Sequence, residues 1–541
     1  MRVLVTLVTL LWMSCLALAQ SGPLDYVEAF RMMPVQQGGR LKPFDTFARE
    51  SVRYVTGKVE FEKRDPVETL LAWWQTGPSE MAKKPVVEFR NKDWKSRLGL
   101  AAEPRYYSLE QLRASTELAR IQEELHQLQP GQKVPRDLSV PQELLGKMRF
   151  FEMLCEGTAW TMVPSPEGLE QSWMALGQLE EAQALQVTVL DPVRKSVRQL
   201  RQALTSQSGR LEAVVALRQS LAAVGPTPSV KDMGRELHYN QFHPFRKAWM
   251  LYLFSLVCLF LTTSRGGALY WTALGAASTG IALHAYGFYL RCMIAGRAPV
   301  TNMYESVIWV GFGAVAFALI FESIYRARSY LMAACAGAVV CLLLADQLPA
   351  VLDPSIRPLM PVLRSNFWLT IHVLTITLGY AAFLLALGLG HMVLWRYLVP
   401  DQREELAGLH TALYPAPQGG VLLLAAGTLL GGVWANYSWG RFWGWDPKEV
   451  WALIALLGYL AILHARYTGW AGNFGTAAFS VLAFQGVLMA WYGVNFVLGA
   501  GLHSYGFGTG GVEYVGMFCL AEVLFVAFVA WRVKARACPP A

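Results

Sequence analysis

The sequence predicts an all-α polytopic membrane protein, with about nine transmembrane helices and an N-terminal, mainly helical extracytoplasmic domain. Hydrophobic residues make up 54% of the chain and charged residues only 16%, whereas a soluble domain carries about 25% charged residues. Long uncharged runs recur from about Ala248 onward, while residues 21–245 are polar, charged and rich in helix-forming residues. The chain therefore divides into a polar domain, residues 21–245, and a membrane domain, residues 246–541.

The first twenty residues have the pattern of a secretory signal. A single early arginine, Arg2, precedes an apolar stretch, and the small residues Ala-Leu-Ala precede Gln20. An uncleaved N-terminal anchor is the alternative interpretation of residues 1–20. Both interpretations predict that the polar domain lies outside the cytoplasm.

Two segments of the polar domain have apolar residues at helical spacing. Residues 107–129 and about 192–224 each predict one amphipathic helix. The domain contains no internal repeat and no catalytic motif, so we expect the chemistry to belong to the membrane domain.

The membrane domain contains nine apolar runs of a length that can cross the hydrocarbon core, which takes about 20 residues. They are residues 247–264, 267–293, 302–323, 329–346, 367–396, 418–436, 448–466, 474–497 and 512–533. Cytoplasmic loops are richer in Lys and Arg. The basic residues favour, nine against six, an orientation with the polar domain outside and the C-terminus inside.

Charge and cysteine content exclude two classes of site. The net charge of +8 is modest for 541 residues, and the basic residues are scattered, so a nucleic-acid surface is not expected. The eight cysteines show no CxxC spacing and mostly lie in or beside apolar runs. They indicate neither a zinc site nor a disulfide framework.

A tryptophan-rich stretch, WGRFWGWDPKEVW, spans residues 439–451 in a predicted outer loop at 437–451. Asp446 before Pro447 is typical of a helix start, with Asp446 as the N-cap residue. One or two tryptophans here would indicate an interfacial aromatic belt. Four tryptophans in thirteen residues, beside glycines and charges at fixed positions, instead predict a flat binding surface.

Five histidines lie in or beside predicted spans, where an ionisable side chain is costly and marks a functional site by default. They are His284, His372, His391, His464 and His503. His391 is near the inner end of its span and is interpreted as a packing or interfacial residue.

His372 and His503 are predicted on the same side of the membrane as the tryptophans. Two imidazoles facing each other across an aromatic shelf are what axial ligation of a haem iron requires. His464 lies sixteen residues beyond Lys448, roughly 24 Å along a helix. It is therefore predicted near the inner half of the bilayer, where it indicates a second haem position.

These residues together resemble the CcsA (ResC) type of system II cytochrome c biogenesis protein, a haem-handling family with a tryptophan-rich WWD signature. The resemblance rests on WGRFWGWDPKEVW and on the order His372, signature, His464, His503. The segment RAPVTNMYESVIW, residues 297–309, adds to it. It covers about residues 245–535.

The resemblance implies cytochrome c assembly in a bacterial inner (cytoplasmic) membrane, with the polar domain and the tryptophan loop on the periplasmic side. Haem b would be delivered to the outer face and attached through thioether bonds to the CxxCH motifs of apocytochrome c, which is holocytochrome c synthase (haem-lyase) activity. His372 and His503 would ligate the external haem. Trp439, Trp443, Trp445 and Asp446 would form its catalytic platform, and His464 would ligate the membrane haem.

The second ligand of the membrane haem stays open at this point. Either a CcsB/ResB-like membrane subunit supplies it, or His284 does. Apocytochrome c, a thioredoxin-like thiol reductant and the lipid bilayer are the other expected partners.

Two rival functions predict different features. A secondary transporter should have internal repeats and broken helices with polar midplane residues, which the sequence lacks. A quinone-linked haem b electron-transfer subunit should have its histidine pairs within the bilayer, whereas His372 and His503 are predicted at the outer margin.

Overall fold

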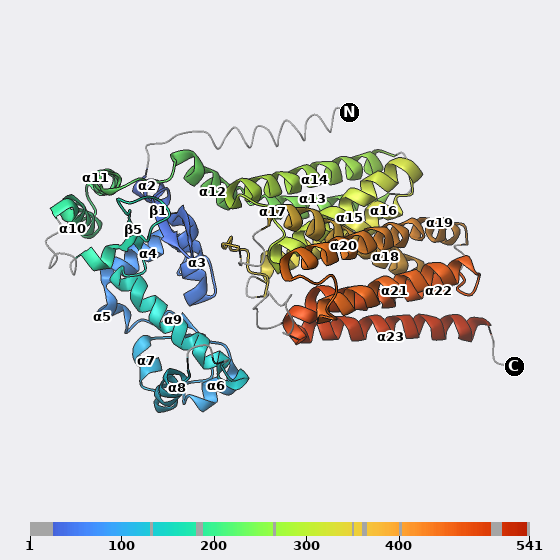
Figure 1. Cartoon of the computed structure of the whole chain (residues 1–541), viewed down its shortest axis with the longest axis horizontal. Coiled ribbons are helices and arrows are strands. Elements are labelled where there is room, and N and C mark those ends of the chain that lie inside the picture. Colours follow the sequence, from blue (N-terminus) through green and yellow to red (C-terminus); the bar gives the residue numbers. More distant parts are fainter. Residues whose placement is uncertain are drawn as a thin grey trace. The chain divides into compact units, whose positions relative to one another are not determined.

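The computed structural model describes residues 25–537, with gaps at 130–131, 133, 180–187, 263–266, 349–350, 360–364, 400–402 and 499–510. The predicted signal or anchor segment, residues 1–20, and His503 lie outside these described residues. The described chain forms two compact units, one ending at Gln241 and the other beginning at Phe242 (Figure 1).

The N-terminal unit is mainly helical, as predicted, and also contains three small antiparallel sheets. Its helices are α2 (Tyr26–Arg31), α3 (Phe44–Thr56), α4 (Pro66–Thr76), α5 (Pro78–Met81), α6 (Lys92–Arg97), α7 (Leu109–Arg113), α8 (Thr116–His126), α9 (Ser139–Glu156), α10 (Asp191–Ser206), α11 (Arg210–Val224) and α12 (Val230–Phe242). The strand pairs are β1 (Pro34–Gln37) with β2 (Arg40–Pro43), β3 (Val87–Glu88) with β4 (Tyr106–Tyr107), and β5 (Thr161–Val163) with β6 (Met174–Ala175).

Each of the two predicted amphipathic helices is divided into two shorter ones, so the prediction of single helices was wrong. Ser115 caps α8 by accepting a hydrogen bond from the backbone N–H of Leu118, which starts a new helix after α7. Gln207 and Gly209 both adopt positive φ, 59° and 64°, and separate α10 from α11. Helices α10 and α11 pack against each other, so one continuous helix over this range is excluded.

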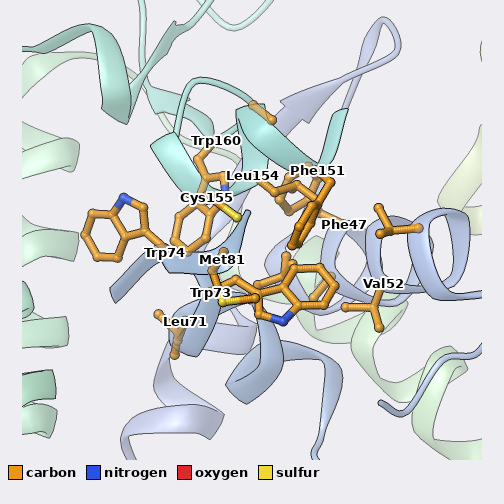
Figure 2. Packing of buried hydrophobic residues seen from close by; sticks show 14 of the residues in the cluster. Phe47, Val52, Leu71, Trp73, Trp74, Met81, Phe151, Leu154, Cys155 and Trp160 are labelled. Atoms are coloured by element: carbon orange, nitrogen blue, oxygen red, sulfur yellow. The ribbon is translucent and has the colours of Figure 1, made fainter. Parts of the chain in front are cut away.

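Large aromatic side chains fill the core of the N-terminal unit (Figure 2). Trp160 is fully buried, and its ring centroid lies 5.1 Å from that of Trp74. Trp73 of α4 meets Phe151 of α9 edge to face, with centroids 5.0 Å apart. Rings in this arrangement add about 0.5–1.5 kcal/mol beyond the burial of their area.

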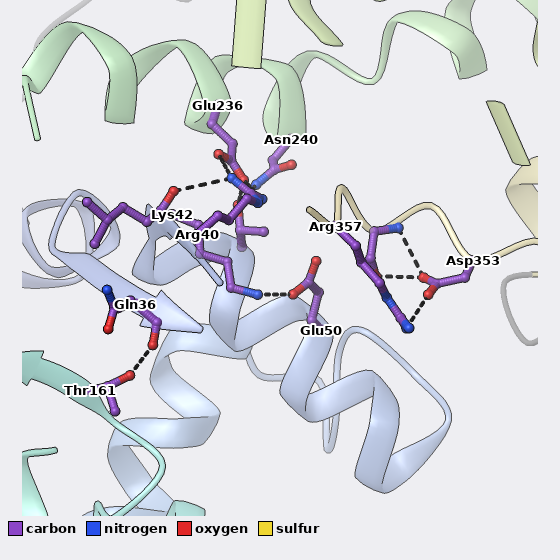
Figure 3. Close-up of polar contacts among 12 residues, drawn as sticks. Gln36, Arg40, Lys42, Glu50, Thr161, Glu236, Asn240, Asp353 and Arg357 are labelled. Carbon is purple, nitrogen blue, oxygen red and sulfur yellow. Dashed lines mark hydrogen bonds and ion pairs between the residues drawn. The ribbon is translucent and has the colours of Figure 1, made fainter. Parts of the chain in front are cut away.

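A buried polar seam joins α12 to the rest of the N-terminal unit (Figure 3). The carboxylate of Glu236 accepts two hydrogen bonds from Arg40, each 2.7 Å, and a third from the Thr46 hydroxyl at 2.7 Å. One turn further along α12, the Asn240 amide donates to Asp45 and Thr46. Because both partners of each bond are supplied, these buried polar groups hold α12 in a defined position.

The membrane unit is a bundle of long helices (Figure 1). They are α13 (Pro244–Leu261), α14 (Ala268–Ala295), α15 (Met303–Tyr325), α16 (Ser329–Gln347), α18 (Leu374–Leu398), α20 (Pro415–Trp439), α21 (Pro447–Tyr467), α22 (Asn473–Leu488) and α23 (Val512–Ala537). The short helices α17 (Asn366–Trp368) and α19 (Arg403–Leu413) precede α18 and α20.

Each of the nine predicted spans is helical over most of its described residues, which confirms the all-α polytopic class. Among the described residues, eight helices are long and apolar enough to cross a membrane by length and composition. The ninth, α14, is 28 residues long but is not among those eight. It packs against α13, α15 and α16.

Helix α18 lies at the centre of the bundle and packs against α15, α16, α20, α22 and α23. Within the described part of the membrane unit there are two π-helical segments, η7 (Leu369–Val373) before α18 and η8 (Met489–Leu498) after α22. Such segments are rare and are frequent at functional sites. The first contains His372, and the second leads into the segment that contains His503.

Candidate haem site

The sequence predicts the tryptophan loop at 437–451, but in the structure only residues 440–446 lie between helices α20 and α21. This tryptophan loop is held in shape by two carboxylates. Asp446 is the N-cap of α21, as predicted, and its Oδ1 accepts from the backbone N–H of Lys448 at 3.0 Å. Glu449 Oε2 accepts from the backbone N–H groups of Gly444, at 2.8 Å, and Asp446, at 3.1 Å. Asp446 is only 6% exposed, so its side chain anchors the loop from inside.

Trp445 is the strained residue of this loop. Its φ of 57° is in the left-handed region, which bulky side chains rarely adopt, and its side chain is 72% exposed. The residues directly before and after Trp445, Gly444 and Asp446, are the two whose backbone N–H groups donate hydrogen bonds to Glu449. The Trp443 and Trp445 rings meet edge to face, 5.9 Å apart. Strain of this kind persists only where the surroundings impose it, and it gathers at ligand sites.

His372 is oriented by helix α20. Its Nδ1 lies 2.8 Å from the carbonyl oxygen of Gly427, and because a carbonyl can only accept, Nδ1 must carry the proton. In that tautomer Nε2 carries the lone pair, which is the state a metal-ligating histidine needs. The Trp434 ring meets the imidazole edge to face at 5.7 Å.

Glycines of α20 bring His372 and the loop to one place. A Cβ at Gly431 would lie 2.6 Å from Cε1 of His372, so only glycine allows the imidazole this close approach. A Cβ at Gly432 would lie 2.6 Å from the ring of Phe442 in the loop. The histidine and the loop therefore pack against consecutive residues of one helix turn.

Two cations accompany this site. Arg441 Nη1 donates to the Gly444 carbonyl at 3.5 Å, and Lys448 lies in the first turn of α21. The acidic residues of the stretch, Asp446 and Glu449, are engaged with backbone N–H groups. Within the described residues, the stretch thus offers positive charge beside an aromatic surface.

His503 lies in residues 499–510, outside the described residues, so its predicted position opposite His372 stays a prediction. The two flanks of that segment are described. The indole N–H of Trp491, in η8, donates to the Ser306 hydroxyl of α15 at 2.9 Å. A Cβ at Gly511 would lie 3.0 Å from the Tyr492 hydroxyl and 3.2 Å from Val351.

His464 and His284 occupy different surroundings. His464 is exposed near the end of α21, and its Nδ1 donates to the Leu460 carbonyl at 2.8 Å. His284 is fully buried in α14, stacked on Phe288 and within 3.3 Å of the Tyr252 hydroxyl. Helix α21 packs against α20, α22 and η8, whereas α14 packs against α13, α15 and α16.

The sequence reasoning missed two side-chain pairs of the membrane unit, one a buried ion pair and the other a part-buried hydrogen bond. Arg291 and Glu305, 0% and 1% exposed, are 2.6 Å apart and join α14 to α15. Arg291 also donates to the Pro354 carbonyl. His391, interpreted from the sequence as packing or interfacial, is bonded to Glu522 of α23 at 2.8 Å. A charged residue inside an apolar run is the signal that could have found both pairs.

Known proteins are similar to this chain over the same part of the membrane unit. Residues 300–503 match the family model described as "Cytochrome C assembly protein". Protein NrfI of Wolinella succinogenes is 27% identical over 516 residues, 90% of this chain and 55% of NrfI, so the chain spans about half the length of that relative. CcsA of Synechococcus sp. (strain RCC307) is 36% identical over 250 residues, 40% of this chain and 78% of the relative. CcsA of Parasynechococcus marenigrum is 32% identical over 286 residues, which are 44% of this chain and 91% of the relative.

Proposed function

Because this chain belongs to the CcsA family of cytochrome c biogenesis proteins, we propose that it holds haem b on its tryptophan loop for covalent attachment to apocytochrome c. The observation that carries the proposal is the orientation of His372, whose Nδ1 is bonded to Gly427. Its ring packs against Gly431, and the next residue, Gly432, packs against Phe442 of the tryptophan loop. His372 would ligate the haem iron through Nε2, with His503 on the other face.

The attachment itself needs little acid or base chemistry. Each thioether bond forms when a thiol S–H adds across a haem vinyl group, so sulfur bonds to one vinyl carbon, hydrogen goes to the other, and nothing leaves. The contribution of the chain is to position the reactants, which supplies a large part of such rate gains. Trp439, Trp443 and Trp445 would hold the macrocycle, and Arg441 and Lys448 would pair with its propionates.

Asp446 has a positioning role in this proposal. Its carboxylate accepts the hydrogen bond that caps α21, so it acts on haem through the shape of the loop. The sequence-based expectation places Asp446 in the haem platform with the tryptophans, and in this proposal it keeps the platform in shape.

A partner subunit is the better source of the second ligand for the membrane haem. His464 is exposed on α21, where an imidazole facing only lipid is costly, so a CcsB/ResB-like helix carrying a histidine would relieve that cost. His284 is enclosed by aromatic rings on helices that pack elsewhere in the bundle. Together these subunits would form a holocytochrome c synthase, with the loop on the periplasmic side of the inner membrane.

The test combines His372→Ala with a matched glycine pair, in full-length chain co-expressed with a CcsB-like partner. His372→Ala should lower cytochrome c maturation about 100-fold or more, since losing even an outer-shell partner of a ligand costs about 10- to 100-fold. Haem content is read from the absorption spectrum, and added imidazole should restore it. Unchanged haem content and maturation would contradict the proposal.

Gly431→Ala should displace the imidazole, because the new Cβ would lie 2.6 Å from its Cε1. A misplacement near 1 Å can cost about 100-fold, so we expect at least a tenfold loss of haem retention. Gly419→Ala is the control on the same helix, where a Cβ meets nothing within 4 Å. Equal behaviour of the two variants would show that His372 does not hold the haem.

A further inference from the structure

A half-open pocket lies at the end of the bundle remote from the tryptophan loop. Four elements meet there: the end of α15, the start of α16, the end of α18 and helix α19. Its lining includes Tyr325, Arg328, Tyr330, Met392, Arg396 and Glu405. His372 and Arg396 are 24 residues apart along one continuous helix, so the pocket lies roughly 36 Å from the imidazole.

The pocket has an excess of positive charge. Arg396 donates to Glu405 Oε1 at 2.8 Å, and Arg328 Nη2 lies 3.7 Å from the same oxygen. Two guanidinium groups thus share one carboxylate. All three side chains are partly exposed, between 24% and 39%, so a ligand can reach them.

The turn between α15 and α16 is built to present Arg328. Arg326 and Arg328 have φ of 48° and 32°, a conformation that non-glycine residues rarely adopt. Arg328 Nη1 donates to the Thr262 carbonyl at 2.7 Å, and its backbone N–H donates to Glu322. These bonds hold a strained backbone in place, which is a mark of a ligand site.

An unsatisfied hydroxyl lies beside the charges. Tyr330 lines the pocket and is 0% exposed, and its hydroxyl has no hydrogen-bond partner among the described residues. A buried hydroxyl left unbonded costs about 1–3 kcal/mol, which a polar ligand would recover.

We propose that this pocket binds the phosphate headgroup of an anionic phospholipid. Arginine forks match phosphate oxygens in geometry and charge. Basic pockets between transmembrane helices are known sites for anionic lipid headgroups. The wall also includes Met332, Met392 and Leu409, which would contact the first part of an acyl chain. Free phosphate would leave that apolar wall without a partner.

The experiment uses the purified full chain in detergent micelles, with phosphatidylglycerol, phosphatidylcholine or inorganic phosphate added. Bound lipid is counted by native mass spectrometry. Retention of phosphatidylglycerol over phosphatidylcholine, without displacement by millimolar inorganic phosphate, supports the proposal. Equal retention of both lipids, or complete displacement by inorganic phosphate, overturns it.

Charge variants separate ligand binding from a structural ion pair. Arg396→Gln should weaken phosphatidylglycerol binding about tenfold, because a charge-assisted contact is lost. Glu405→Gln should strengthen it, because both arginines lose a competing carboxylate. A purely structural triad predicts weaker binding for both changes, and that outcome overturns the proposal.

Two further variants control for folding. Tyr330→Phe removes only the hydroxyl and should weaken binding about threefold, in line with the loss of one hydrogen bond. Arg326→Gln removes the same charge from the same turn, at an exposed residue outside the pocket lining, and should leave binding unchanged. Equal losses in Arg326→Gln and Arg396→Gln would show non-specific attraction of anions and overturn the site.

Discussion

The two units of this chain are both mainly helical, but they expose different kinds of side chain. The N-terminal unit encloses aromatic and aliphatic residues such as Trp160, and its surface is charged. Nearly all exposed large hydrophobic side chains of the described residues lie from Met250 onward. Both units also bury charged groups, Asp45 and Glu236 in the N-terminal unit and the pair Arg291–Glu305 in the membrane unit. In lipid, then, exposed apolar surface says little about function, and buried polar groups mark what the fold must preserve.

The largest effect that sharpens this comparison is expected at the Arg291–Glu305 pair. Removing one partner, as in Arg291→Met, leaves a buried charge alone and should cost about 3–5 kcal/mol of stability. The double variant Arg291→Met with Glu305→Met should be more stable than either single variant. Thermal unfolding in detergent measures all three, and a simple sum of the two single losses would contradict a direct pairing.

A matched pair of lysine substitutions tests whether exposed side chains of the two units face lipid or water. Leu457 is 54% exposed in the middle of α21. Changing it to lysine should raise the free energy of membrane insertion by about 2.5–3.5 kcal/mol, the penalty of a charge at a helix centre. Val215, 42% exposed on α11, should change stability by no more than about 0.5 kcal/mol. Membrane integration and unfolding assays read the two effects. Equal costs would mean that α21 does not face lipid.

The smallest effect concerns Cys155 in the core of the N-terminal unit. Burial, with the nearby charge of Glu156, raises the pKa of this thiol to about 12. Since the thiolate is the reactive form, alkylation at pH 8 should be much slower in the folded unit than in denaturant. The raised pKa also means that this group favours folding at low pH and that its contribution falls as pH rises above about 9. Rapid labelling of the folded protein would contradict this burial.

The helical spans could be predicted because each contains enough apolar residues to cross the bilayer, a property of local sequence alone. The cap at Asp446 could be predicted for the same reason, since capping depends on residues within one turn. The contact of His372 with Gly427 and Gly431 could not, because it joins residues 55 apart in the chain. The π-helical turn that contains His372 also left no recognisable signal.

The Arg291–Glu305 pair lies between these cases. Each residue stands out as a charge at the end of a span, but only the packing of α14 on α15 identifies the partner. The breaks in residues 107–129 and 192–224 were missed because apolar residues at helical spacing occur on both sides of each break. Periodicity therefore predicts which face is buried better than where a helix ends.

The two bonds to Glu449 have a thermodynamic consequence. They fix the backbone on both sides of Trp445 in the unliganded chain, so the entropy of ordering the loop is lost during folding and not during binding. Ligand affinity is then not reduced by that ordering cost, and association need not wait for the loop to rearrange.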